Sequence, residues 1–311
     1  MTTQKLELKC MKTKSRKSKI LFTLASVLVI GSGALIGLML GQKYFALDYS
    51  GIDIEIDEKD DELYQKFLSL KNKNVQPSRY LSEFRPYQLV KLGLMNFEKE
   101  PYAQITNKGT VNASVTNQTI CSKYIKYNDS YFAESLSSGL MKIGWRFYQT
   151  KENEIKVYKS SGLKDSESAQ WPNTPKDVFT TSTFKETWGK SMTMPFIYTL
   201  NHLTVDKENE TSKIDGDNII VDLTLEPQLS TINYGKQMKE TSGLSGVPNF
   251  SSVTLQLTLT HDLMIIRNDI SEKYNTPYHG LPVSTKGTIT ENYTYLENIS
   301  IPSLSEDVDY K

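Results

Sequence analysis

Cysteine and histidine are scarce in this chain. Its 311 residues include two cysteines, Cys10 and Cys121, and three histidines. Cys10 precedes a long apolar segment and Cys121 follows it, so the C-terminal part of the chain contains a single thiol. No intramolecular disulfide can form there, and its stability has to come from packing.

No residue pattern names a reaction. Among the histidines His202, His261 and His279, only His261 has an adjacent carboxylate, Asp262. Neighbouring side chains in a strand point to opposite faces, so we interpret both as strand-end residues. Nothing around Cys121 indicates the electropositive setting of a nucleophile, which favours a structural cysteine. We predict no catalytic residue, no cofactor and no enzyme activity; a catalytic site assembled from distant segments is the alternative.

Metal-ligand spacing is absent as well. The segment from Asp215 to Asn218 resembles the start of a calcium loop, but Ile219 stands where a further oxygen ligand is required. A hairpin turn explains the segment better. We interpret the acidic run over 48–62 as a solvated surface, and we predict no metal site.

The chain has no overall charge of one sign, because 36 basic residues balance 36 acidic ones. Residues 1–19 hold one acidic residue, Glu7, and seven basic residues: Lys5, Lys9, Lys12, Lys14, Arg16, Lys17 and Lys19. The remainder is therefore acidic by about six charges, and we expect no nucleic-acid partner.

A long apolar run follows this basic tail. Twenty-one residues from Ile20 to Leu40 span ~31 Å as a helix, about one bilayer core. The run is too long for a cleaved signal peptide, the competing interpretation, so we predict a signal-anchor over 20–41. The basic flank predicts a single-pass type II cell-membrane protein, with residues 1–19 cytoplasmic and the rest extracellular. Gly33 and Gly37 have the spacing of a helix-dimer face, which would give a homodimer.

Residue usage favours a bacterial cell-envelope protein, since Lys, Asn and Ile are abundant. Seven N-x-[ST] sequences would suggest glycosylation in a eukaryotic secretory protein. Because the chain is rich in Asn, Ser and Thr, chance explains these matches better. They begin at Asn112, Asn117, Asn128, Asn209, Asn249, Asn292 and Asn298.

Residues 42–80 are predicted to form an acidic juxtamembrane spacer with a short strand around Ile54 and a helix over 58–70. A β-rich extracytoplasmic domain over 81–303 and a C-terminal tail over 304–311 follow. The best helix signal in this domain runs from Ser82 to Phe97, with Pro86 in its first turn and an end at Glu100-Pro101.

Period-two alternation dominates after this helix and predicts hairpins in sequence order. We predict strands over 109–116, 118–127, 131–138, 142–150, 154–159, 219–225, 253–260, 263–275 and 286–296. A long loop over 160–181 crosses between the two halves, and helices are predicted over 179–189 and 230–241. The fold class is therefore α+β, a mainly antiparallel curved sheet with one to three packed helices.

This layout resembles the LolA-like group of bacterial envelope proteins. The resemblance covers roughly residues 82–298 and is carried by three segments: 86–97, 109–127 and 234–274. It implies an open, strongly curved antiparallel sheet wrapped around helices that can hold a lipid-like ligand. The chain departs from the soluble carriers of this group in its predicted anchor, which argues against shuttling between two membranes.

The three tryptophans are the candidate binding residues. Trp145, Trp171 and Trp188 can line a ligand groove, with Trp171 in the crossing loop as a lid, or they can fill the core. The sequence predicts a noncatalytic envelope protein of unknown function that binds the bilayer through residues 20–41. We predict binding of a lipid-like ligand in the curved sheet; an interaction module for an envelope protein partner is the alternative.

Overall fold

The computed structural model describes residues 60–113, 116–139, 142–150, 153–242, 244–278 and 281–310. The predicted cytoplasmic tail, the predicted signal-anchor with Gly33 and Gly37, and residues 42–59 of the predicted spacer lie outside these ranges. Within them, no helix combines the length and apolar character needed to cross a membrane.

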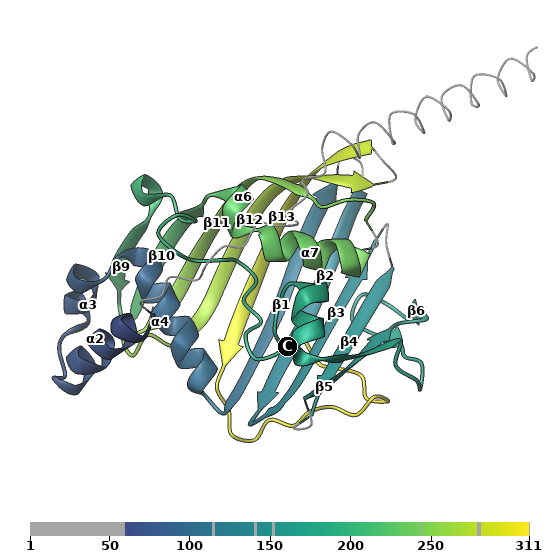
Figure 1. Ribbon diagram of the computed structural model, residues 1–311, viewed down its shortest axis with the longest axis horizontal. Helices are drawn as coiled ribbons and strands as arrows, with labels where there is room; N and C mark the ends of the chain where they lie inside the picture. The colour runs from purple at the N-terminus through teal and green to yellow at the C-terminus, as the bar shows by residue number, and fades with distance from the viewer. Residues whose placement is uncertain are drawn as a thin grey trace, which may run out of the picture.

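One large antiparallel sheet dominates the described residues, which confirms the α+β class (Figure 1). Eleven strands pair in the order β8-β5-β4-β3-β2-β1-β13-β12-β11-β10-β9. Their bounds are β1 (Tyr102–Ala113), β2 (Thr116–Tyr127), β3 (Ser130–Ser138), β4 (Ile143–Gln149), β5 (Glu154–Lys159), β8 (Asp177–Thr180), β9 (Thr211–Asp215), β10 (Asn218–Leu225), β11 (Asn249–Thr260), β12 (Ile265–Tyr278) and β13 (Leu281–Thr294). The hairpins expected in sequence order are confirmed, and the β1–β13 pair joins the two halves of the chain.

The helices are more numerous than predicted. They are α2 (Asp60–Asn72), α3 (Pro77–Glu83), α4 (Pro86–Lys99), α5 (Thr181–Trp188), α6 (Pro227–Ser230) and α7 (Ile232–Ser242), with a short 3-10 helix over Lys207–Asn209. Helices α4, α5 and α7 lie on one face of the sheet, which we call the inner face (Figure 1). The opposite face is called the outer face.

Two of the predicted helices form for the expected local reasons. Pro86 occupies the first turn of α4, where its missing N–H costs no hydrogen bond, and Leu89, Val90 and Leu92 are fully buried. In α5, Thr180 caps the N-terminus and Gly189 ends the helix at a φ of 69°, a left-handed conformation that glycine adopts without strain.

The chain segments flanking the predicted domain pack more closely than expected. Residues 60–80, assigned to the spacer, include Phe67 and Tyr80, which are buried in the main core. The predicted C-terminal tail lies against the outer face, where Tyr310 donates a hydrogen bond to Glu134 and Arg146 donates to the Leu304 carbonyl at 2.7 Å. Both segments therefore pack against the rest of the described chain, because their apolar and hydrogen-bonding side chains find partners on it.

The crossing loop is also partly ordered into strands. It contains the small hairpin of β6 (Gly162–Leu163) and β7 (Ala169–Gln170), and it ends in β8, which pairs with β5. The hairpin and the C-terminal segment cover a second apolar cluster on the outer face of β2, β3 and β4.

Candidate functional site

The inner face is packed unevenly. On β10 and β11 its side chains are large and buried, with Leu223, Leu255 and Leu257 each at most 2% exposed. On four central strands, β3, β2, β1 and β13, eight inward positions are partly exposed and most of them carry Ser, Asn, Gly or Glu. Other inward residues of these strands, such as Tyr124 and Tyr293, are buried. We call the eight partly exposed positions the central floor: Asn107, Gly109, Ile120, Ser122, Ser135, Ser137, Ile289 and Glu291.

Helix α7 crosses above the central floor (Figure 1). At one end, the indole Nε1 of Trp145 on β4 donates to the Thr241 carbonyl at 2.8 Å. Toward the other end, the Tyr234 hydroxyl lies 3.4 Å from a carboxylate oxygen of Glu272 on β12. Since the floor strands lie between β4 and β12 in the sheet, α7 bridges them from one flank to the other.

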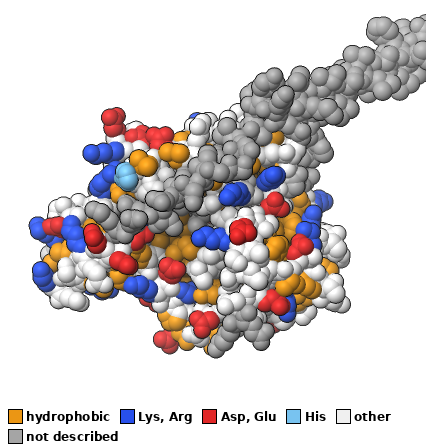
Figure 2. Space-filling view, viewed as in Figure 1, with side chains coloured by type: hydrophobic (Ala, Val, Ile, Leu, Met, Phe, Trp, Pro, Cys, Tyr) orange, Lys and Arg blue, Asp and Glu red, His pale blue; other side chains and the backbone are white. Residues whose placement is uncertain are grey.

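Hydrophobic side chains reach the surface in the middle of this face, with charged side chains to either side (Figure 2). Ile120 and Ile289 of the floor and Met238 of α7 are partly buried against the core. Several inward side chains in this region are partly exposed, and carboxylates lie in the same region.

Two glutamates point inward, Glu272 from β12 and Glu291 from β13. Glu272 is 1% exposed and accepts hydrogen bonds from the hydroxyls of Tyr198 and Tyr234, while burial raises its pKa to about 7. Glu291 accepts from the Asn268 amide and the Tyr293 hydroxyl, both at 2.9 Å, and burial raises its pKa too. An apolar environment disfavours the charged form of both carboxyl groups.

A lysine faces this carboxylate region. Burial lowers the pKa of Lys190 to about 8, and the charge of Glu291 acts in the opposite direction. Lys190 directly follows the Gly189 cap of α5, and its amino group lies 5.4 Å from the ring centre of Phe147.

Hydrogen-bond acceptors remain unsatisfied beside Glu291. The sheet register places Asn107 of β1 and Asn268 of β12 directly opposite it on either side. The side-chain carbonyl oxygen of each asparagine is buried and has no hydrogen-bond partner. A buried acceptor of this kind costs about 1–3 kcal/mol of stability when it is left unpaired. Both oxygens are free to accept further hydrogen bonds.

The structure separates the three candidate tryptophans. Trp145 and Trp188 are buried in the inner core with ring centres 5.1 Å apart. Trp171 lies on the outer face with the Arg146 guanidinium 4.6 Å from its ring centre. Side chains at successive positions of β4 point to opposite faces, so Trp145 and Arg146 bring their tryptophan partners to opposite sides of the sheet. The three residues do not form one groove, and Trp171 does not cover the inner face.

Other candidate residues occupy structural positions. Cys121 is 2% exposed in the outer cluster, where burial raises its thiol pKa, which fits a structural cysteine. The segment from Asp215 to Asn218 is the predicted turn, between β9 and β10. His261 follows the end of β11, and His279 lies outside the described ranges. Over those ranges, no group of three or more His, Cys, Asp or Glu side chains could hold a metal ion.

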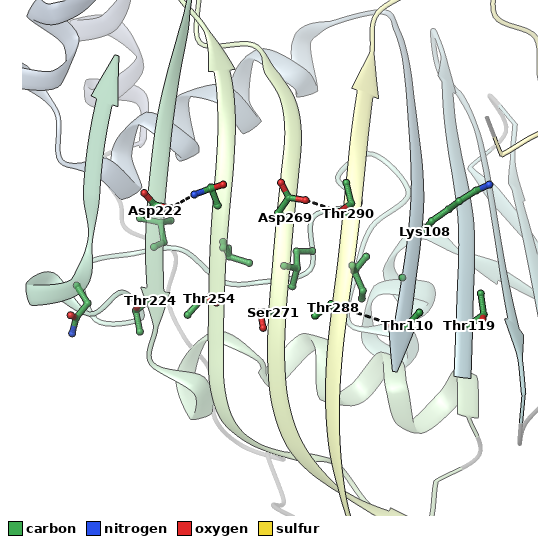
Figure 3. A pocket seen from close by; sticks show the side chains of 17 residues that line it. Lys108, Thr110, Thr119, Asp222, Thr224, Thr254, Asp269, Ser271, Thr288 and Thr290 are labelled. Carbon is green, nitrogen blue, oxygen red and sulfur yellow. Dashed lines mark hydrogen bonds between the residues drawn. The ribbon is translucent and has the colours of Figure 1, made fainter. Parts of the chain in front are cut away.

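The outer face carries a shallow groove of about 840 Å³ (Figure 3). A row of hydroxyl side chains crosses it in register over six strands: Thr224, Thr254, Ser271, Thr288, Thr110 and Thr119. Neighbouring strands lie ~4.8 Å apart, so the row offers hydrogen-bonding groups at a regular spacing.

The charged side chains of this groove are paired. Asp222 accepts from the Gln256 amide at 2.7 Å, and Lys108 lies 2.9 Å from Glu167. Arg267 forms two hydrogen bonds with Asp269 and lowers its pKa. No histidine or cysteine lines the groove, and most of its polar side chains are hydroxyls and amides.

The inward glutamates were missed by the sequence predictions. In the strand predicted over 263–275, Glu272 falls in the same phase as Ile270 and Tyr274, which are buried. A carboxylate in the apolar phase of an alternating strand is the signal that could have identified it. Glu291 gives a similar signal between Ile289 and Tyr293.

Comparisons with known proteins find similarity at the level of structure alone. No protein-family model and no curated protein sequence matches the chain. Similar solved structures include LprF from Mycobacterium bovis, at 11% identity and a TM-score of 0.34, covering 70% of this chain and 96% of that chain. A DUF1329 family protein from Desulfovibrio piger has 10% identity and a TM-score of 0.28, covering 69% of this chain and 93% of that chain. At these TM-scores the matches carry no argument about function, and the detailed resemblance to the LolA-like group stays a prediction.

Proposed function

We propose that this domain binds an amphipathic, lipid-like ligand on the central floor, beneath α7, and catalyses no reaction on it. The observation that carries the proposal is the composition of the four central strands. At the central-floor positions the inward side chains are partly exposed and most are Ser, Asn, Gly or Glu, whereas the flanking strands β10 and β11 are filled by large buried aliphatics.

The apolar part of such a ligand would lie against the exposed parts of Ile120, Ile289 and Met238. Burying apolar surface of this kind contributes about 25 cal/mol per Å². The polar end would face Glu291 and Asn107, so it would keep hydrogen bonds after it leaves water. In this arrangement α7 covers the ligand, a role first predicted for the Trp171 loop.

We also propose that residues 20–41 anchor the domain to the cell membrane with the N-terminus in the cytoplasm. The support is the apolar length of this segment and its basic flank. Protease added to intact cells should then remove the domain and leave a short membrane-bound fragment. Full protection of the domain in intact cells, with cleavage after lysis, would contradict this topology.

Native mass spectrometry of the full chain, released gently from detergent, tests the ligand proposal. Wild-type protein should carry an additional lipid-sized mass. Ser122→Phe fills the central floor from β2 and should remove this mass. Thr119→Phe places the same ring on the outer face of the same strand, where Thr119 is exposed, and should retain it. A clean apo mass for wild type, or equal retention by both variants, would argue against binding on the floor.

A second candidate function is docking of a polar protein partner in the outer groove. The in-register hydroxyl row favours it, because it presents donors and acceptors over six strands. Cross-linking in cells should trap one recurrent partner that is lost in the double variant Thr110→Val and Thr288→Val. Recovery of the same neighbours with and without these substitutions would count against the groove.

A further inference from the structure

The polar end of the central floor is rich in acceptors. Glu291 has an asparagine directly opposite it on each neighbouring strand, Asn107 on β1 and Asn268 on β12. The Asn268 amide nitrogen donates to Glu291 at 2.9 Å, which leaves the Asn268 carbonyl oxygen to face another group. That oxygen is buried without a partner in a residue that is 0% exposed, and the Asn107 carbonyl oxygen is buried without a partner as well.

Two hydroxyl donors near this cluster are already engaged, and the charge of Lys190 also acts on Glu291. The Tyr293 hydroxyl donates to Glu291, and the Tyr198 hydroxyl donates to Glu272. The Asn107 and Asn268 oxygens have no donor from the protein, so an incoming group that pairs with them must supply donors of its own. Access is available at Glu291 and Asn107, which are both partly exposed.

We infer that the polar end of the ligand carries a protonated primary amine, which donates hydrogen bonds to Glu291 and to the neighbouring asparagine oxygens. This inference rests on the proposed function. An ammonium group provides three N–H donors and a positive charge, and hydrogen bonds between charged partners are the stronger class. An alcohol offers one donor and no charge, and a quaternary ammonium offers charge without N–H donors.

Three probes with the same twelve-carbon tail separate these contributions: dodecylamine, dodecyltrimethylammonium and dodecanol. Binding to the full chain held in amphipol is measured by isothermal titration calorimetry near neutral pH. Dodecylamine should bind about tenfold more tightly than dodecanol, with the quaternary probe between them. Spermidine, which has amines but no tail, should bind much more weakly than dodecylamine if the ligand is a lipid.

Substitutions in the acceptor cluster of Glu291, Asn107 and Asn268 test whether the preference for the amine arises there. Glu291→Gln keeps the side-chain size and should abolish the preference for dodecylamine over dodecanol. Asn107→Asp adds a carboxylate and should increase the preference for dodecylamine. Because such a gain requires a folded protein, this variant tests the inference even if Glu291→Gln does not fold. Thr110→Val lies on the outer face of β1 and should leave the preference unchanged.

The outcomes distinguish failure of the amine inference from failure of the proposed lipid binding. Equal binding of dodecylamine and dodecanol would overturn the amine inference and leave lipid binding on the floor intact. Tight binding of spermidine would assign the site to a free amine instead of a lipid. Failure of all three tailed probes would overturn both the inference and the proposed function.

Discussion

The flanking and central strands of the sheet use their inner faces differently. On β10 and β11 every second residue is a large aliphatic, and these side chains are buried to at most 2% exposure. On β3, β2, β1 and β13 the equivalent positions include aromatic and aliphatic side chains together with Ser, Asn, Gly and Glu. The flanks therefore supply much of the burial that stabilises the domain, and the centre has less burial and more hydrogen-bonding groups.

This contrast indicates where function is separated from stability within one sheet. Buried carboxylates and unpaired amide oxygens destabilise a protein unless they are used. They lie on the strands beneath α7, and the packing of the flanks on either side can offset the stability that these groups cost. The following predictions test whether the separation holds.

The largest effect is expected from Leu257→Ala on the flank. Leu257 is 0% exposed in β11, and truncation of a fully buried leucine typically costs about 2–5 kcal/mol. Ile289→Ala on the central floor removes a similar volume from a partly exposed side chain and should cost less than half as much. Urea unfolding followed by tryptophan fluorescence measures both; equal losses would show that the centre is packed as firmly as the flank.

Glu272 should make stability depend on pH. Its pKa is raised from 4.5 to about 7 in the folded protein, so the folded state binds the proton more tightly than the unfolded state. The stability that Glu272 contributes is then fully present below pH ~4.5 and is lost as pH rises through about 7, with a slope of at most ~1.4 kcal/mol per pH unit. Glu272→Gln should flatten the unfolding free energy over this window, whereas an unchanged slope would assign it to other groups.

A smaller effect is expected where α7 is attached to β4. Trp145→Phe removes the hydrogen bond to Thr241 and should cost about 1 kcal/mol beyond the packing loss. Trp188→Phe is the matched control, because its indole nitrogen is buried without a partner and only packing is lost. Hydrogen exchange over 232–242 should accelerate more in the first variant. Equal acceleration would mean that the hydrogen bond does not hold α7 in place.

The smallest effect is expected at the serines of the floor. Ser122 and Ser135 are partly exposed, and Ser→Ala at either position should change the unfolding free energy by no more than about 0.5 kcal/mol. The same urea titration measures it. A loss above about 1.5 kcal/mol would mean that these hydroxyls belong to a packed network, and it would remove the contrast between centre and flank.

Much of the fold was predictable from local patterns. The strict alternation over 219–225 and 253–260 predicts strands with one buried face, and both strands form with that face inward. Pro86 and Gly189 mark helix boundaries through backbone geometry alone. The candidate site was much harder to predict from the sequence. Trp145 and Trp171 pack against opposite faces of the sheet, and the face that each contacts depends on partners far away in the chain.

The sequence by itself determined the fold class, the order of the hairpins and the apolar and basic segments behind the predicted anchor, since each follows from local composition or short-range periodicity. Tertiary structure decided the rest. Pairing of β1 with β13 brings Asn107 opposite Glu291 across a separation of 184 residues, and β12 adds Asn268 on the other side. The acceptor cluster exists because sheet register aligns residues from distant segments, and no local pattern records that alignment.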